Sequence, residues 1–493
     1  MRQRLYFFAF LAYLAVLPIA NTVALRNLLA VFLLGILVST LLHKTWRGAL
    51  NVTALKSPAL IPLLLWALYL CLFPLWADQP QTAWENLRGQ WGMSLLAWVL
   101  GFGGVLVLGR QGPGLWQLGL ASAFLVGLHM FMSLLAWSGL LGSDVPADLP
   151  LKQMLSALKS VLDGGTPWAW QPFPWGFRGF DPMHGNLGYT ANQATVLFMC
   201  CLLFAMLARR YAAAGWDGLA VIVCFMSVVI AYSRGAVLYG AGVVALAILV
   251  FYLRLFWRVG AVKAGLRRDQ LAPVLAVWAV LLLAALFSFS KDERWHQMGD
   301  KIRIAYMIED PVSFLCEGPD EALLGGIRTR MADRDPVYVA ALIDGLKGDG
   351  ARITLMRAGW LLVQAQPLGL DGSRLAYKKL IESTCGHAPA MVYEHAHQGW
   401  LDTALALGWV GALLLLALLL GFACYGWRHM LHPDAGPWAL ALLLLVVFWG
   451  LRGFADSIYR EHLLQMQAVL MAFVCARVAI ESRGAPSVEG RAI

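Results

Sequence analysis

Long apolar runs constrain this chain more than any other feature of its sequence. A helix needs roughly 20 apolar residues to cross the hydrocarbon core of a bilayer. Candidate spans lie near residues 5–22, 26–43, 57–76, 92–109, 114–140, 186–208, 217–232, 235–256, 271–290, 399–424, 436–452 and 462–480. Only 14% of the 493 residues are charged, against about 25% in soluble domains. The sequence therefore predicts an all-α polytopic membrane protein with about 12 transmembrane helices.

Lysines and arginines are distributed unevenly over the connections between these spans. With a cytoplasmic N-terminus, seventeen of them fall in the N-terminus, residues 43–56, 110–113, 209–216, 254–270 and 425–435, and the C-terminal tail. The short outer loops carry only Arg26, Arg88, Arg234, Arg452 and Arg460. Cytoplasmic loops of membrane proteins carry an excess of Lys and Arg. Both termini are therefore predicted to be cytoplasmic, and the net charge of +9 does not indicate a nucleic-acid partner.

The same orientation divides the chain into four parts. Residues 1–290 hold helices 1–9, and their outer loop, 141–185, contains an amphipathic helix expected to lie at the membrane interface. Residues 291–398 form a large, mainly helical periplasmic subdomain, in which "RITLMRAGWLLVQAQPLG" is the clearest helix. Residues 399–480 hold helices 10–12, and residues 481–493 are expected to be a disordered cytoplasmic tail.

Two of the eight cysteines lie away from the spans. Cys316 and Cys385 both fall in the large outer segment, whereas the other six lie in or beside apolar runs. Disulfides persist in oxidising compartments. A disulfide between Cys316 and Cys385 and a pair of free thiols both remain open at this point, and no Cys/His spacing resembles a zinc site.

Arginines on the outer face are the first candidates for a binding site. Arg234, in "AYSRGAVLYG", lies between two closely connected spans, where it either binds a ligand or snorkels to headgroups. Arg88 is either functional or an interfacial anchor paired with Glu85. Arg178, in "PWGFRGFDPMHGNLGYTANQ", leads into a span and could line a site.

Two more arginines lie on the helix of the large outer segment. Either Arg352 or Arg357 could point towards the membrane while the other is solvated, and Arg452 and Arg460 are expected to be headgroup anchors. Guanidinium groups bind phosphate oxygens bidentately and stay charged when partly buried. Several of them at one membrane surface favour a lipid-linked phosphate or pyrophosphate as the ligand.

Titratable groups stand directly before the tenth span, in "EHAHQGWLDTALALGWVG". A neutral imidazole can accept a proton near pH 7, so His397 is the candidate general base. The stretch reads His-Gln, nine residues, then Gly-x-x-Gly. It resembles the signature of the bacterial O-antigen ligases, the WaaL family, which is related to the O-antigen polymerases and the protein O-oligosaccharyltransferases.

Three other stretches carry the same resemblance. "SRGA" at 233–236 is similar to the family's Ser-Arg-Gly between two helices, and "FRGFDPMHGNLGYTANQ" is similar to its Arg-x-Gly stretch before a middle helix. Counting from Arg352, fifteen residues on, places Pro367 in register with the family's Pro-Leu-x-Gly. The match covers most of residues 80–415, and it implies a GT-C-like membrane fold with the large loop between helices 9 and 10.

The resemblance implies a metal-independent, inverting glycosyl transfer at the periplasmic face of the bacterial inner membrane. The donor would be an O-antigen glycan on undecaprenyl pyrophosphate, and the acceptor a hydroxyl of lipid A-core oligosaccharide. His397 would be the catalytic base, and Arg234, Arg352 and Arg88 would hold the pyrophosphate. Supporting roles are assigned to Arg178, Arg357, Glu394, His395, Gln398 and Asp402. No metal ion or organic cofactor is expected, and Glu394 or Asp402 could orient the imidazoles or Gln398.

Two other kinds of function remain open. The chain could be an O-antigen polymerase or a protein O-oligosaccharyltransferase, because these enzymes share the donor half of the site. It could also be a transporter of a polyprenyl-linked sugar. Transporters tend to place charges near the bilayer midplane on broken helices in related halves, whereas the charges here are predicted to cluster at one face.

Overall fold

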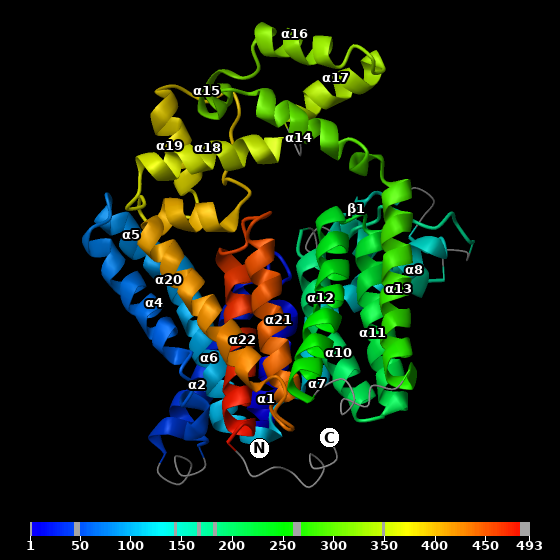
Figure 1. Cartoon of the computed structure of the whole chain (residues 1–493), viewed down its shortest axis with the longest axis vertical. Helices are drawn as coiled ribbons and strands as arrows, with labels where there is room; N and C mark the ends of the chain where they lie inside the picture. The colour runs from blue at the N-terminus through cyan, green and yellow to red at the C-terminus, as the bar shows by residue number, and fades with distance from the viewer. Residues whose placement is uncertain are drawn as a thin grey trace.

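The protein is a helical membrane bundle with a helical cap at one end (Figure 1). A computed structural model describes residues 2–43, 50–141, 145–164, 169–180, 185–259, 268–347 and 351–483. The structure confirms the mainly helical, multi-pass class predicted from the sequence.

The bundle is built from helices that follow the predicted apolar runs. They are α1 (Arg2–Val16), α2 (Val23–Leu42), α4 (Leu60–Leu72), α5 (Pro80–Asn86), the π-helix η3 (Leu87–Trp91), α6 (Gly92–Leu108), α7 (Leu115–Ser122), α8 (Phe124–Trp137), α10 (Leu187–Leu207), α11 (Tyr211–Ile230), α12 (Arg234–Val259), α13 (Arg268–Lys291), α20 (Gly399–His429), α21 (Gly436–Arg452) and α22 (Glu461–Glu481).

Helix length supports fewer spans than the predicted twelve. Eight helices in the described part of the chain are long and apolar enough to cross a membrane, or nine if α7 and α8, which meet at 49°, form one bent span. The remaining three predicted spans fall on shorter helices, because α1 has 15 residues, α4 has 13 and α21 has 17. The predicted number of twelve is therefore not established.

Helix α22 forms the centre of the bundle and packs most closely against α6. A Cβ atom added to Gly101 of α6 would lie 2.3 Å from the Val469 carbonyl oxygen and 2.5 Å from the Ala472 Cβ of α22. Small residues at such positions let two membrane helices approach until their backbones touch. This contact holds the N-terminal end of α22, which carries part of the candidate site, in a rigid setting.

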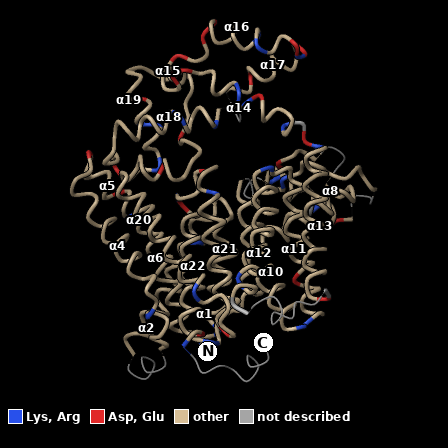
Figure 2. The backbone as a smooth tube through the Cα atoms, in the orientation of Figure 1, with Lys and Arg blue, Asp and Glu red and all other residues tan. Residues whose placement is uncertain are grey.

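The end of the bundle opposite the cap brings together the start of α1 and the end of α22 (Figure 1). The Gln3 side chain donates to the Val107 carbonyl at the end of α6, and Arg110 pairs with Glu481 at 3.2 Å. Charged residues lie mainly at the two ends of the molecule, and the middle of the bundle is largely uncharged (Figure 2).

The first large outer segment contains a short helix and a two-stranded sheet. Helix α9 (Leu151–Leu162) is the amphipathic helix expected there, with Met154 buried and Leu155 exposed. Strands β1 (Asp148–Leu149) and β2 (Gly179–Phe180) pair in parallel. Residues 181–184 and, at the C-terminus, residues 484–493 of the predicted disordered tail lie outside the described residues.

The cap follows α13 and corresponds to the predicted subdomain. It contains the 3₁₀ helix η6 (Glu293–Trp295), α14 (Met298–Met307), α15 (Pro311–Glu317), α16 (Glu321–Arg330), α17 (Pro336–Asp344), η7 (Gly345–Lys347), α18 (Arg352–Ala365) and α19 (Ala376–Cys385). The side chains of Asp310, Asp320 and Asp335 accept hydrogen bonds from the first turns of α15, α16 and α17. Such N-caps satisfy amide groups that a helix start leaves without partners.

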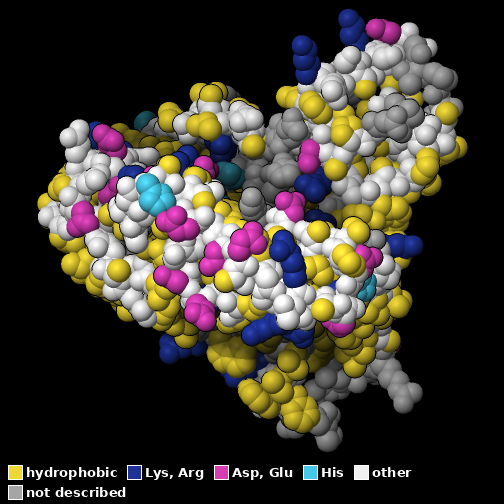
Figure 3. Space-filling view, turned by 90° about the horizontal axis from the view of Figure 1, so that it is seen from above, with side chains coloured by type: hydrophobic (Ala, Val, Ile, Leu, Met, Phe, Trp, Pro, Cys, Tyr) yellow, Lys and Arg dark blue, Asp and Glu magenta, His cyan; other side chains and the backbone are white. Residues whose placement is uncertain are grey.

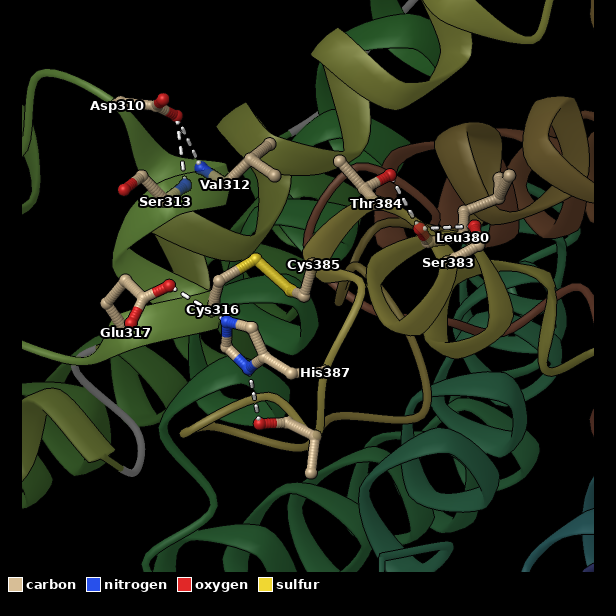
Figure 4. Close-up of a disulfide and its surroundings, with 11 residues drawn as sticks. Asp310, Val312, Ser313, Cys316, Glu317, Leu380, Ser383, Thr384, Cys385 and His387 are labelled. Carbon is tan, nitrogen blue, oxygen red and sulfur yellow. Dashed lines mark hydrogen bonds and ion pairs between the residues drawn. A yellow bond between two sulfur atoms is a disulfide. The ribbon is translucent and has the colours of Figure 1, made fainter.

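A disulfide joins the two ends of the cap. Cys316 of α15 is bonded to Cys385 of α19, with their Cα atoms 5.4 Å apart and a sequence separation of 69 (Figure 4). Beside it, the His387 Nε2 atom lies 2.9 Å from the Glu317 carboxylate. The contact of His387 with the Ala388 carbonyl, and then its pairing with Glu317, raise the pKa of His387.

Helix α20 is broken at Gly408, which has φ 75° and ψ 173°. The cap loop 367–372 inserts at the break. Its Leu370 and Gly372 amides donate to carbonyl groups of α20 at 2.9 Å each, and the Trp409 amide donates to the Pro367 carbonyl at 3.0 Å. Backbone groups freed by a helix break at membrane depth need such partners. The loop thereby sets the direction of the first two turns of α20, which begin at the candidate site.

Candidate functional site

The site is built around His397, at the junction of the cap and α20. His397 has φ 53°, a left-handed conformation that residues other than glycine rarely adopt. The next residue, Gln398, is the N-cap of α20, and its side chain accepts a hydrogen bond from the Leu401 amide at 2.5 Å. Strained conformations of this kind cluster at functional sites. The turn at His397 therefore aims the imidazole independently of the helix that follows.

Asp456, in the loop between α21 and α22, faces this imidazole. One carboxylate oxygen lies 4.0 Å from the His397 Nδ1 atom, and the other accepts hydrogen bonds from the Tyr189 hydroxyl at 2.5 Å and from Arg452 at 3.3 Å. Burial acts to raise the pKa of Asp456, but the positive charge of Arg452, the Tyr189 hydrogen bond and the charge of Arg352 lower it. Asp456 is therefore a carboxylate at neutral pH.

Arg452 is buried in the site and is not the headgroup anchor expected from the sequence. Its guanidinium group lies over the rings of Tyr189 and Tyr239, at 4.8 and 4.9 Å, in addition to its contact with Asp456. A Cβ atom on Gly235 would lie 2.4 Å from Arg452 Nη1. The glycine after Arg234 thus makes room for Arg452, and not for a ligand at the backbone.

Positive charges surround the paired histidines. The rings of His395 and His397 are 4.2 Å apart. Burial and the charges of Arg460, His397 and Arg352 lower the pKa of His395 to about 3, so His395 is neutral at physiological pH. Arg352 and Arg460 therefore lie within electrostatic reach of His395, and Arg352 is also within reach of Asp456. Arg460 therefore acts electrostatically on His395, whereas the sequence predicted that Arg460 anchors the protein at lipid headgroups.

Arg234 lies on the other side of Arg452. It is the first residue of α12, and its Nη1 atom donates to the Arg294 carbonyl at 3.1 Å. Arg294 pairs with the buried Asp292 at 2.8 Å and donates to the Tyr232 carbonyl. Arg234 is thus connected to the start of the cap, and it adjoins the His397 cluster through Gly235 and Arg452.

Within the described part of the chain, the residues that were expected to support the histidines, Asp402 and Glu394, make no hydrogen bond or ion pair with the imidazoles. Asp402 accepts hydrogen bonds from the Ala396 amide, at 2.8 Å, and from the Ser457 hydroxyl. It therefore ties the histidine segment to the Asp456 loop and does not bond His397 or the Gln398 side chain. Glu394 is exposed, and no hydrogen bond or ion pair in the described structure joins it to either imidazole. Asp456 occupies the position for which the sequence suggested Glu394 or Asp402.

Arg357, one of the two arginines that the sequence placed towards the membrane or in solvent, closes the end of a neighbouring cap helix. Its Nη1 atom donates to the Ala305 and Ile308 carbonyls, at 2.8 and 2.7 Å, where α14 ends. Arg357 also lines an apolar groove of about 640 Å³ between α18 and α20. Other lining residues are Gln398, Trp360, Trp400, Trp409, Leu413 and Leu416. The groove starts beside His397 and follows α20 into the bundle.

Two predicted arginines lie apart from this cluster. Arg88 lines a separate depression with Gln81, Trp84 and Glu85, and it makes no ion pair with Glu85. Arg178 pairs with Asp148 at 3.4 Å beside the small β-sheet. Within the described residues, no contact links either arginine to His397.

The described residues contain no group of three His, Cys, Asp or Glu side chains placed to hold a metal ion. The sequence contains one Asp-x-Asp stretch, Asp333 to Asp335, but Asp335 caps α17 and Arg334 pairs with Asp300 at 3.7 Å. This stretch is therefore part of the structure of the cap.

Sequence reasoning did not identify Asp456 or Tyr189. Asp456 is the one acidic residue in the short, otherwise neutral or basic connection between α21 and α22, "GFADSIYR". Tyr189 follows "HGNLG" at the start of α10 and was visible only as part of a polar stretch. The sequence signal that could have identified Asp456 is a carboxylate in a short outer loop beside Arg452 and Arg460.

In a comparison with known families, residues 219–416 match an O-antigen ligase domain. This range includes α12, the cap and the first half of α20, and therefore Arg234, Arg352 and His397. It excludes Arg452 and Asp456, which complete the cluster from the C-terminal helices. No protein of curated function matches the chain.

Proposed function

From the match of residues 219–416 to an O-antigen ligase domain, we propose that this chain is an inverting glycosyltransferase of the bacterial inner membrane. It transfers an O-antigen glycan from undecaprenyl pyrophosphate to a hydroxyl of lipid A-core oligosaccharide, with the cap and the site on the periplasmic side. This assignment makes the protein the ligase of lipopolysaccharide biosynthesis, acting on two membrane lipids.

The observation that carries this proposal is the meeting of His397, Asp456 and several guanidinium groups below the cap. The Asp456 carboxylate lies 4.0 Å from His397 Nδ1, which is longer than a hydrogen bond. Catalytic hydrogen bonds are often long in the absence of substrate and shorten in the complex. A proton held on Nδ1 by Asp456 would leave Nε2 to accept the proton of the acceptor hydroxyl.

The chemical step is a direct displacement at the anomeric carbon. The acceptor oxygen forms the new glycosidic bond while the bond to the pyrophosphate oxygen breaks, and the hydroxyl proton passes to His397. General base catalysis of this kind contributes about a hundred- to ten-thousand-fold. The pyrophosphate leaves with its negative charge, which Arg352 and Arg234 offset from opposite sides of the cluster.

The groove along α20 suits the hydrocarbon part of a lipid-linked donor. Its lining is mainly apolar, and Gln398 at one end is the neighbour of His397. A polyprenyl chain in this groove would lie against Trp409, Leu413 and Leu416, on the half of α20 beyond the break at Gly408. Its pyrophosphate would then be held near the start of α18, where Arg352 lies.

The test is a transfer assay with purified protein in nanodiscs, with defined donor and acceptor lipids and no nucleotide or ion gradient. We expect wild-type protein to join the glycan to lipid A-core with inversion, and His397→Ala to abolish the product while the protein remains folded. Elongation of the donor glycan in place of transfer to the core would make the chain a polymerase. Full transfer by His397→Ala would end the general-base assignment.

A further inference from the structure

A buried arginine lies in the first turn of α2, outside the lining of the apolar groove. Arg26, in the first turn of α2, is only 8% exposed. Its Nη1 atom donates to the Leu17 carbonyl at the long distance of 3.4 Å, and its Nε atom is buried with no hydrogen-bond partner. No carboxylate of the described residues pairs with it. A buried charge without an opposite charge costs several kcal/mol, so a bound anion would stabilise this position.

A second unsatisfied donor lies beside Arg26. Tyr13 of α1 is fully buried, and its hydroxyl has no hydrogen-bond partner. The two residues are close enough to interact electrostatically. Buried polar groups are hydrogen-bonded in the great majority of cases. Two orphaned donors on neighbouring helices therefore indicate an acceptor that the protein itself does not supply.

Polar residues of α10 and α22 lie near Arg26. His462 of α22 lies within electrostatic reach of Arg26, and its Nε2 atom is 3.3 Å from the Asn186 side-chain oxygen. Asn186, the N-cap of α10, donates in turn to the Pro18 carbonyl at 2.8 Å. The one acidic neighbour, Glu461, is 3.8 Å from His462 Nδ1 and is paired with Arg374 of the cap.

Arg460 connects these residues to the catalytic cluster. It acts electrostatically on His462 on one side and on His395 on the other. A lipid bound at Arg26 would therefore lie near the residues that surround His397. His462 and Glu461 are partly exposed, whereas Arg26 is buried.

We propose that Arg26, with His462 and Asn186, forms a subsite for a phosphate group on the acceptor glycolipid. A phosphate oxygen accepts from the Arg26 guanidinium and offsets its charge, since arginine binds phosphate bidentately. This assignment rests on the proposed function, because it names the part of the acceptor that the chain recognises. It separates the two lipids: the donor occupies the α20 groove, and the acceptor enters between α2, α10 and α22.

The test compares two acceptors, phosphorylated lipid A-core and the same glycolipid after phosphatase treatment, in nanodiscs of neutral lipid. We expect wild-type protein to have a KM about tenfold or more lower for the phosphorylated acceptor. Arg26→Gln should abolish this preference, with kcat on the dephosphorylated acceptor unchanged. Arg328→Gln, an exposed arginine of the cap, is the matched control and should keep the preference.

A binding measurement keeps the subsite separate from the reaction. We expect phosphorylated glycolipid alone to raise the melting temperature of wild-type protein and not that of Arg26→Gln, even if no transfer occurs with any donor. That result would support the subsite although the proposed function had failed. If Arg26→Gln does not fold, Arg26→Lys, which keeps the charge, takes its place in both measurements.

Three outcomes would overturn the proposal. If the ratio of the KM values for the two acceptors is the same in wild-type protein and in Arg26→Gln, the acceptor phosphate does not contact Arg26. If phosphatidylglycerol raises the melting temperature of wild-type protein but not of Arg26→Gln, and the acceptor phosphate has no effect, Arg26 binds a bulk membrane lipid. No effect of either lipid would leave water as the partner of Arg26 and Tyr13.

Discussion

Gly369 of the cap and Gly408 of α20 approach so closely that a Cβ atom on Gly369 would lie 2.2 Å from the Gly408 nitrogen. The reverse substitution is equally blocked, because a Cβ on Gly408 would lie 2.6 Å from the Leu368 carbonyl. Both glycines have positive φ values, 80° and 75°. The Pro-Leu-Gly stretch at 367–369 and the Gly-x-x-Gly stretch at 408–411 therefore meet each other, and their contact sets the angle at which α20 leaves His397.

Gly408→Ala should disrupt the site from a distance. The left-handed conformation alone costs a non-glycine residue about 1–2 kcal/mol, and the contact with Leu368 forces the loop 367–372 away. We expect transfer activity to fall about a hundredfold or more, because the break no longer holds the first turns of α20. Gly450→Ala, where nothing lies within 4 Å of the added Cβ, is the control. Equal activity of the two variants would exclude this role.

Asp456→Asn removes the charge that faces His397 without changing the size of the side chain. The asparagine leaves the buried Arg452 without its carboxylate and no longer stabilises a protonated His397. We expect kcat to fall about a hundredfold, within the usual range for general base catalysis, with little change in the acceptor KM. Asp148→Asn, which breaks the Arg178 pair away from the site, should leave kcat unchanged. Wild-type kcat in Asp456→Asn would show that His397 acts without it.

The roles of His395 and His397 should be distinguishable from the pH dependence of activity. The pKa of His395 is about 3, so this residue stays neutral across the working range and cannot set the acidic limb of activity. We expect His395→Gln to lower kcat by at most a few-fold and to leave the midpoint of that limb in place. A shift of the midpoint in His395→Gln would mean that His395 is the titrating base.

The same residue affects stability in a defined direction. Because the folded pKa of His395 lies below the unfolded value of about 6.5, the unfolded state binds more protons between these values. Wild-type stability should therefore fall as the pH drops from 6.5 towards 3. His395→Gln should show a shallower decrease in melting temperature over that range, and an identical slope would contradict the low pKa.

Arg352 and Arg88 should differ although both were predicted to bind pyrophosphate. Arg352 lies within electrostatic reach of Asp456 and His395, whereas Arg88 lines the separate depression with Trp84. We expect Arg352→Gln to reduce kcat/KM for the donor at least tenfold, and Arg88→Gln to reduce it less than threefold. A larger effect of Arg88→Gln would place the pyrophosphate against α5 and η3.

The cap should depend on its disulfide. A bond that closes a loop of this length typically stabilises a fold by about 2–4 kcal/mol, mainly by restricting the unfolded chain. Cys316→Ser should therefore lower the melting temperature and the activity together, since α15 and α19 hold the segment that leads to His397. Cys71→Ser, at an exposed thiol, is the control. Unchanged stability of Cys316→Ser would mean that the cap holds α19 without the bond.

Seen from above, the surface of the molecule carries acidic, basic and histidine side chains among apolar ones (Figure 3). The sequence predicted the helical membrane class and the family, because long apolar runs and short motifs are local patterns. It also predicted the cap helix that starts at Arg352 and the histidine before α20. Each of these features depends on residues within one or two turns of each other.

The tertiary structure decided which charges meet. Asp456 is 59 residues from His397 in sequence, and Tyr189 is 267 residues from Asp456, so no local pattern pairs them. Arg452 was expected at headgroups, yet it binds Asp456. The carbonyl groups at the end of α14 that Arg357 contacts could not be predicted from the sequence. The sequence also did not determine the number of spans, because short helices can be as apolar as long ones. Partners of buried charges are chosen by how separate helices pack, since only close contact in a low-dielectric interior makes such an interaction strong.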